Sequence, residues 1–351
     1  MKDKKFFTHL LIIILSGLVV IEGLTVVIQN TGNTKPNQET DIVEEKLPEN
    51  GISNYGRLSV SGNHIVDENG NEVLLKGMST HGITWFPRYA NSAAMNTIRE
   101  YGGNVIRLAL YSENVSQDED YWDDVRDYAY LTIENALAND MYIIVDWHVL
   151  SDENPLVNKD KAMEILDEIS SHYGNEPGII YEICNEPNGD TSWQDIKEYA
   201  NGIIPLIRGN AKDAIIIVGT PNYSTALKDA FDDKLEWTNL LYAYHVYVDA
   251  TTDASFDFSY IAQIVESGMP VFVSEWGIKN TEVPDEKLNA KSSQEFLNYL
   301  NENKIGWCYW SLSNKDETHS CIKSDCEKYS GWKYEDMTFG GRIAFEALGK
   351  E

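Results

Sequence analysis

The sequence predicts an α/β protein whose main domain is a (β/α)8 barrel, the TIM-barrel architecture. Its 351 residues leave room for one barrel, which takes roughly 250 residues, and an N-terminal extension. Short apolar runs alternate with amphipathic stretches along most of the chain, which is typical of parallel strands and the helices that connect them. A doubly wound open sheet is the alternative, but no glycine-rich phosphate turn follows the first apolar run.

Residues 1–28 are predicted to be a signal peptide or a membrane anchor. Three lysines among the first five residues precede an apolar run from Phe6 to Ile28, which Glu22 interrupts. A basic segment followed by an apolar one is the pattern of an export signal. Because no small-x-small cleavage site is evident, a cleaved peptide and a retained anchor both stay open. We therefore expect a protein that is secreted or anchored at the extracellular face of a bacterial membrane.

Residues 29–54 are predicted to form a flexible linker, because they are polar and acidic and show neither a helical nor a strand period. The barrel domain is expected to span residues 55–351. It opens with two alternating runs, 57–63 and 64–73, which contain Gly-Asn turn signals. This pattern predicts a β-hairpin that caps the N-terminal face of the barrel.

Eight apolar runs are predicted to form the barrel strands, at residues 73–78, 103–109, 142–147, 179–184, 214–219, 240–245, 271–275 and 306–311. Between several of them, apolar residues recur at helical spacing, as in 125–137, 162–169, 196–207 and 296–300. Strands that alternate with helices in this way favour a closed parallel barrel.

Two of the predicted strands end in a glutamate. The run IIYEIC is followed by Asn185, Glu186 and Pro187, and the run VFVS ends in Glu275. A barrel gathers the C-terminal ends of its strands on one face, where active sites of this fold lie. Glycoside hydrolysis with retention needs two carboxyl groups roughly 5–5.5 Å apart, one as nucleophile and one as acid/base. The pair therefore suggests sugar chemistry.

Polar and aromatic side chains lie at nearly all of the predicted strand ends, where packing alone would favour apolar residues. They are His81, Trp85, Arg107, Tyr111, His148, Asn185, His245, Tyr247 and Trp310. Buried polar groups without partners are costly, so a shared site is the simpler interpretation. The flat rings of Trp85, Tyr111, Trp147 and Trp310 are expected at the rim, where they offer surfaces against which the C–H groups of a pyranose can pack.

Composition limits the class of ligand. A net charge of −28 disfavours nucleic acid and anionic lipid surfaces as partners, so a neutral substrate and no nucleic acid are expected. The protein is expected to be a monomer. Metal binding by His81, His148 and His245 is an alternative, but no HxH pair or bridging lysine supports it, and neither a metal nor a cofactor is predicted. Pairing of Cys321 with Cys326 stays open.

From about Tyr55 to Leu348 the chain resembles the cellulases of glycoside hydrolase family 5, in particular the bacterial endoglucanases of its subfamily 2. The resemblance rests on seven motifs: STHGITW (79–85), NVIRLA (104–109), VDWH (145–148), YEICNEPNG (181–189), HVY (245–247), VSEWG (273–277) and WSLSNKDE (310–317). The chain departs from the family after HVY, where it reads VDATTDAS in place of a small-residue run with another histidine.

This resemblance implies roles for individual residues. Glu186 would be the acid/base and Glu275 the nucleophile, while Arg107 and Tyr247 would orient the carboxylate of Glu275. The implied binding roles concern the rest of the site: His148 and His245 shape the network around the acids, Asn185 binds the sugar 2-hydroxyl, Trp310 forms the floor, and His81, Trp85, Lys315 and Glu317 belong to glycone-side subsites.

The predicted function is that of a retaining endo-β-1,4-glucanase that acts on β-glucan such as cellulose. Another β-1,4-glycanase, a mannanase or a mixed-linkage glucanase, is the alternative within the enzyme class, because one axial hydroxyl is discriminated by loops that the sequence does not position. A non-catalytic polysaccharide-binding barrel would be expected to lack a carboxylate or Arg107, and all three are present.

Overall fold

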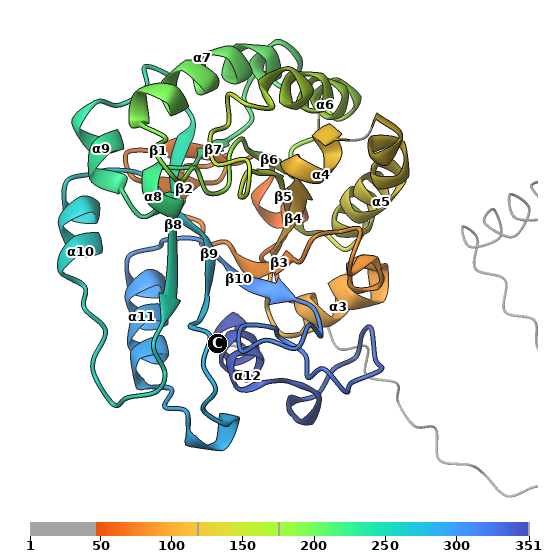
Figure 1. Ribbon diagram of the computed structural model, residues 1–351, viewed down its shortest axis with the longest axis vertical. Coiled ribbons are helices and arrows are strands. Elements are labelled where there is room, and N and C mark those ends of the chain that lie inside the picture. Colours follow the sequence, from red (N-terminus) through yellow and green to blue (C-terminus); the bar gives the residue numbers. More distant parts are fainter. Residues whose placement is uncertain (1–46, 118, 175, 350–351) are drawn as a thin grey trace, which may run out of the picture. The chain divides into compact units, whose positions relative to one another are not determined.

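The computed structural model describes residues 47–117, 119–174 and 176–349 of the chain. In this part, eight parallel strands close into a barrel in the order β10-β3-β4-β5-β6-β7-β8-β9, and helices surround the strands (Figure 1). The predicted TIM barrel is confirmed. Its strands are β3 (Lys76–Thr80), β4 (Val105–Tyr111), β5 (Tyr142–His148), β6 (Ile179–Glu182), β7 (Ile216–Val218), β8 (Leu240–Val248), β9 (Val271–Ile278) and β10 (Trp307–Leu312).

Each predicted strand run overlaps an observed strand, and among the strand starts the largest shift is that of the first strand. Residue 73 was predicted to begin that strand, whereas β3 begins at Lys76. The reason is that the backbone N–H of Val73 donates to the carbonyl oxygen of Ile65, so Val73 still belongs to the preceding hairpin.

The main helices carry the apolar periodicity that the sequence shows. They are α3 (Ser92–Glu100), α4 (Ser112–Gln117), α5 (Glu119–Ala138), α6 (Lys159–His172), α7 (Trp193–Asn210), α9 (Leu227–Asp232), α10 (Ser259–Glu266), α11 (Lys291–Glu302) and α12 (Phe339–Leu348). In α7, Ser192 caps the first turn by accepting from the backbone of Asp195, and a stripe from Ile196 to Ile207 is buried against the barrel.

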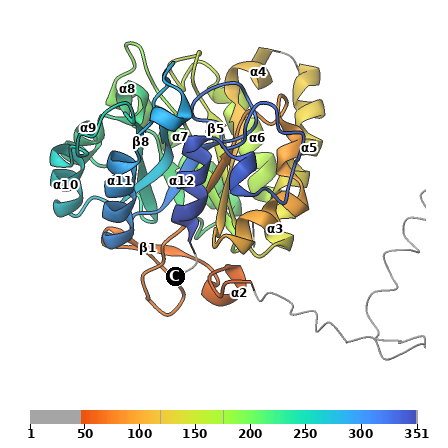
Figure 2. The ribbon, with the colours of Figure 1, turned by 90° about the horizontal axis from the view of Figure 1, so that it is seen from below.

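The predicted N-terminal hairpin is present as β1 (Ser59–Ser61) and β2 (His64–Val66), which pair antiparallel. Its residues Leu58 and Ile65 belong to the same apolar cluster as Val105 and Tyr142, which begin barrel strands. The hairpin thus closes the N-terminal end of the barrel, and Figure 2 shows β1 and the short helix α2 (Ile52–Tyr55) beneath it.

The last residues of the predicted linker contact the barrel domain. Arg99 donates to the carbonyl oxygen of Pro48 and to the side chain of Asn50, and the backbone N–H of Ile52 donates to the carbonyl oxygen of Asp140. Contacts with the barrel therefore begin before residue 55, the predicted domain boundary. The buried guanidinium of Arg99 explains this, because its donors need acceptors that these residues supply.

The predicted signal or anchor segment, residues 1–28, and most of the predicted linker lie outside the described residues. Within the described ranges, no helix combines the length and the apolar character needed to cross a bilayer.

The two ends of the barrel differ in polarity. The N-terminal half of its interior is filled by apolar side chains such as Ile144, Ile180 and Ile217. Every residue of β4, β5 and β9 is buried, including the polar ones toward their C-terminal ends. Those polar groups must find partners within the protein or a ligand, because burial without hydrogen bonds is costly.

Candidate active site

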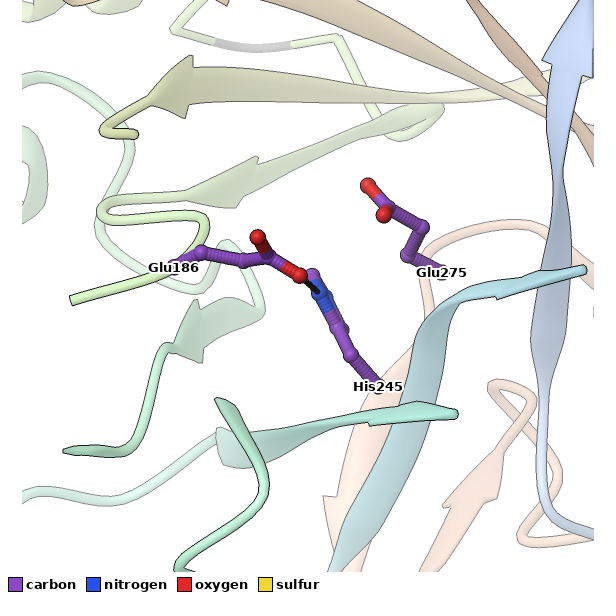
Figure 3. A group of neighbouring side chains, drawn as sticks. All are labelled: Glu186, His245 and Glu275. Atoms are coloured by element: carbon purple, nitrogen blue, oxygen red, sulfur yellow. Dashed lines mark hydrogen bonds and ion pairs between the residues drawn. The ribbon is translucent and has the colours of Figure 1, made fainter. Parts of the chain in front are cut away.

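The two glutamates predicted to be catalytic lie together at the C-terminal mouth of the barrel. Glu186 follows β6, Glu275 belongs to β9, and His245 belongs to β8 between them in the sheet order. One carboxylate oxygen of each glutamate and a ring nitrogen of His245 all lie within 4.8 Å of one another. Figure 3 shows the two carboxyl groups reaching into the same space from opposite sides.

Both oxygens of Glu275 have partners that favour its ionised form. The Tyr247 hydroxyl donates to Oε1 at 2.6 Å, and the guanidinium of Arg107 lies 3.3 Å from Oε2. Burial, followed by the charge of Glu186, raises the pKa of Glu275, whereas His245, Arg107 and Tyr247 lower it. The net effect is a raised pKa for Glu275, because burial and the nearby charge of Glu186 outweigh these partners.

Arg107 is the cation that joins the carboxylates. It is fully buried and contacts Glu182 at 2.7 Å, Asp146 at 3.0 Å and Glu275 at 3.3 Å. It also donates to Oδ1 of Asn185 at 2.7 Å. The three acids raise the pKa of Arg107 against the opposing effect of its burial, so it stays charged and fixes the positions of groups from the ends of three strands, β5, β6 and β9.

The contacts of His148 are consistent with a neutral imidazole. Burial, with Arg107 and His245 nearby, lowers its pKa well below the usual range. Its Nδ1 lies 2.6 Å from Oδ2 of Asp146, and its Nε2 lies 3.3 Å from the amide nitrogen of Asn185. In a neutral ring the proton then sits on Nδ1, so that Nε2 accepts from Asn185. His148 and Arg107 thus hold the two ends of the Asn185 amide.

The contacts of His245 favour the opposite charge state. Its Nδ1 lies 2.8 Å from Oε1 of Glu186, and its Nε2 lies 2.9 Å from Oγ of Ser274. Burial lowers the pKa of His245, but Glu275, Glu182 and Glu186 outweigh that effect and raise the pKa to about 10. An imidazolium beside Glu186 follows from the surrounding negative charge.

Aromatic rings line one wall of the mouth. Trp310 stacks on His148 with ring centroids 5.1 Å apart, and Tyr111 lies 4.2 Å from the same imidazole. Trp310 is 6% exposed and therefore presents only part of its ring, as a floor would, whereas Trp85 is 50% exposed and stands against Tyr111 at the rim. Three of the predicted aromatic residues are thus brought together, whereas Trp147 is fully buried in the hydrophobic core and offers no surface to a sugar.

The loop after β10 places the remaining predicted residues beside His81. Lys315 and His319 pair with Glu317 at 2.6 and 3.0 Å, and Nζ of Lys315 lies 3.3 Å from Nε2 of His81. Burial raises the pKa of Glu317, but hydrogen bonds from His319 and Lys315 prevail and lower it to about 2. The structure thus places the predicted site residues around one mouth.

Sequence reasoning assigned no role to three buried members of the network: Asp146, which it placed at a strand end, Glu182 and Ser274. Asp146 and Glu182 are register partners on β5 and β6, and both contact Arg107. An acidic residue within the apolar run IIYEIC was the available signal for Glu182, because a buried carboxylate needs a partner. Nothing in the run VFVS distinguishes Ser274 from a serine that only packs.

The alternative of a three-histidine metal site is not supported by the surroundings of the rings. Nδ1 of His81 accepts from the backbone N–H of Gly82 at 2.7 Å, and the nitrogens of His148 and His245 face the partners described above. Glu186, His245 and Glu275 form a group whose atoms could in principle converge on a cation. In that group Tyr247 and Arg107 contact the two oxygens of Glu275, and His245 contacts Oε1 of Glu186.

Comparison with known proteins agrees with this geometry. Residues 66–316 match the family described as cellulase, glycosyl hydrolase family 5. The chain is 40% identical over 314 residues to endoglucanase A of Butyrivibrio fibrisolvens, covering 86% of this chain and 71% of that protein. It is 35% identical over 299 residues to an endoglucanase of Clostridium saccharobutylicum, covering 84% of this chain and 65% of that protein. Both relatives extend well beyond the region that this chain matches.

Solved structures show the same architecture. The catalytic domain of Thermobifida fusca endoglucanase Cel5A in complex with cellotetraose superposes with a TM-score of 0.74 at 29% identity, covering 85% of this chain and 98% of that one. A GH5 cellulase from an Icelandic hot spring isolate gives a TM-score of 0.75 at 32% identity, covering 86% and 97% of the two chains. The chain described here therefore belongs to the cellulase family of glycosyl hydrolases, family 5.

Proposed function

We propose that this protein is a retaining endo-β-1,4-glucanase in which Glu275 is the nucleophile and Glu186 the acid/base. The observation that carries the proposal is the approach of the two carboxyl groups, with oxygens within 4.8 Å across the mouth. Retaining enzymes hold their carboxyl groups about 5–5.5 Å apart, whereas inverting enzymes leave room for a water at roughly 6.5–9.5 Å. Relatives named endoglucanase and a neighbour that binds cellotetraose support a β-1,4-glucan as substrate.

The two glutamates take different roles because their partners differ. Arg107 and Tyr247 direct donors at both oxygens of Glu275, so they stabilise and orient the carboxylate that attacks the anomeric carbon. For Glu186, Nδ1 of His245 lies 2.8 Å from one oxygen, Oε1, and Figure 3 shows the other oxygen pointing away from that imidazole. That second oxygen is the one available to protonate the glycosidic oxygen of the leaving sugar.

The reaction then runs in two steps. In the first, Glu275 forms a bond to the anomeric carbon while Glu186 transfers its proton to the departing oxygen. In the second, Glu186 accepts a proton from a water molecule that attacks the same carbon, and the bond to Glu275 breaks. Asn185, held by Arg107 and His148, is placed to bind the 2-hydroxyl of the sugar, and Trp310 lies beneath it.

The stereochemistry of the product tests this proposal. Two displacements at one carbon preserve configuration, so the first product from a soluble cello-oligosaccharide is expected to be the β-anomer. Proton NMR of early hydrolysis, before mutarotation, measures it. Initial α-anomer would contradict the double displacement. Parallel reducing-end assays on carboxymethyl cellulose, barley glucan, mannan and xylan serve as the substrate control, and activity confined to mannan would overturn the glucanase assignment.

We also propose that the protein acts outside the cell, through an export segment in residues 1–28. The basic residues and the apolar run from Phe6 to Ile28 support this proposal. If the segment is retained, activity should sediment with membranes and be released by mild proteolysis within residues 29–47. If it is cleaved, N-terminal sequencing should place the mature start after residue 28. Full-length protein in the soluble cytoplasmic fraction would contradict both versions.

A further inference from the structure

Glu182 and Ser274 form a buried connection between Arg107 and His245. Oγ of Ser274 lies 2.7 Å from Oε1 of Glu182 and 2.9 Å from Nε2 of His245. The other oxygen of Glu182 accepts from Nε of Arg107 at 2.7 Å. Both Glu182 and Ser274 are completely buried, so neither has solvent as an alternative partner. Neither belongs to the pair of carboxyl groups, Glu186 and Glu275, that is proposed to react with the substrate.

The direction of these hydrogen bonds determines where the imidazole carries a proton. Arg107 holds Glu182 in its ionised form, and an ionised carboxylate can only accept. The single hydroxyl proton of Ser274 therefore goes to Glu182, which leaves an oxygen lone pair facing His245. Nε2 of His245 must then donate to Ser274, in either charge state of the ring.

A proton on Nε2 constrains the other ring nitrogen. Nδ1 lies 2.8 Å from Oε1 of Glu186, a distance that requires a proton between the two atoms. Either the ring is cationic and Nδ1 donates to Oε1 of Glu186, or the ring is neutral and Nδ1 accepts a proton from Oε1. Only the first arrangement leaves Oε2 of Glu186 free to carry the proton that goes to the leaving sugar.

We propose that Glu182 and Ser274 are positioning residues for the acid/base. They fix a proton on Nε2 of His245, so that Nδ1 is hydrogen-bonded to Oε1 of Glu186 and holds the acid/base with Oε2 toward the substrate. The proposal rests on the acid/base role proposed for Glu186. It adds that this role depends on two residues that do not touch the substrate. The opposite tautomer, with the proton on Nδ1 alone, would leave Ser274 and Nε2 competing for one proton.

The charge around His245 favours the cationic form of this arrangement at neutral pH. The charged groups that act on it or on its immediate partners come from four strands and the loop after β6: Glu182, Glu186, Glu275, Asp146 and Arg107. Four of these five groups are acids. His148, which belongs to β5 and whose pKa is lowered, provides an internal comparison.

Nitrogen-15 NMR of the histidine-labelled full chain tests the proposal on the unaltered protein. At pH 7, both ring nitrogens of His245 are expected to carry protons and the ring to titrate above pH 8, whereas His148 is expected to show an unprotonated Nε2. His245→Gln and His148→Gln assign the resonances. A His245 ring whose Nε2 carries no proton at neutral pH would overturn the proposal.

Ser274→Ala tests the connection itself. Without the bridging oxygen, Glu182 lies 3.8 Å from Nε2, so the titration of His245 should move down by about one pH unit or more. Ser274→Thr keeps a hydroxyl and should titrate as the unaltered protein does. Ser293→Ala is the matched control, because Ser293 is a buried serine in α11 whose Oγ has no partner in the described part of the chain. An unchanged titration in folded Ser274→Ala would refute the connection.

Kinetics separate positioning of the acid/base from a merely structural role. For Ser274→Ala, kcat/KM on a cello-oligosaccharide should fall at least about tenfold more than on an aryl cellobioside whose leaving group needs no proton. Equal losses on both substrates would mean that Ser274 only supports the fold. If Glu186→Gln also lacks this leaving-group difference, the acid/base assignment fails; if Glu186→Gln shows it and Ser274→Ala does not, only the present inference fails.

Discussion

Glu275→Ala is expected to lower turnover on cello-oligosaccharides by on the order of 10⁴-fold or more, because no other group is placed to attack the anomeric carbon. The fold should persist. Arg107 retains Asp146 and Glu182 as partners when the Glu275 carboxylate is removed, so no unpaired charge is left buried. The initial rate and the thermal unfolding midpoint of the variant are both measured. A large loss of rate with an unchanged midpoint indicates loss of the nucleophile and not of the fold.

Rescue by a small anion makes this result specific. The space left by the carboxylate lies next to Arg107 and Tyr247, which would bind azide or formate. With an activated aryl glycoside, such an anion should restore part of the activity and give a glycosyl azide of inverted configuration. Glu302→Ala, which removes an exposed glutamate at the end of α11, serves as control and should behave like the unaltered protein. Near-normal turnover of Glu275→Ala would sink the nucleophile assignment.

Glu186→Gln is expected to separate substrates by their leaving groups. Gln keeps the shape of the side chain and can still accept from Nδ1 of His245, but it has no proton to donate to a sugar oxygen. Activity on cello-oligosaccharides should fall about 10²- to 10⁴-fold. An aryl cellobioside with an activated leaving group should still form the glycosyl-enzyme and release a burst of phenol, because only the later attack of water lacks its base.

Rapid-mixing measurement of phenol release checks this expectation. The burst amplitude should approach one equivalent per active site, followed by a slow steady state that azide accelerates. Glu302→Gln is the control for the same substitution at an exposed site. Equal losses with good and poor leaving groups, and no burst, would argue that Glu186 is not the acid/base.

Much of the site could be predicted because barrel topology converts sequence order into proximity. Once eight strands alternate with helices, their C-terminal ends must meet on one face, so residues as distant as Arg107 and Glu275 can be read as one group. The structure places them 3.3 Å apart. The same reasoning predicted that His148, His245 and Trp310 lie at the mouth of the barrel, and it used no information on side-chain contacts.

Two details at the boundaries of the prediction differ in the structure. The hairpin extends to Val73, and the residues from Pro48 to Ile52 contact the barrel although their composition is that of a linker. The first is set within the hairpin itself, by the carbonyl oxygen of Ile65, and residue 73 was placed in both the hairpin run and the strand run. The second depends on the side chain of Arg99, a partner distant in sequence about which local composition carries no information.

The sequence by itself determined the barrel, the strand ends and the pair Glu186 and Glu275, because strand and helix periodicity and the positions of polar residues along the chain are local properties. Only the tertiary structure decided which groups share protons. That Glu182 reaches His245 through Ser274, while His148 faces Asp146 and Asn185, depends on the register of neighbouring strands and on angstrom-scale distances between side chains. Those distances and the charges around each ring shift the pKa values of two buried histidines of one mouth in opposite directions.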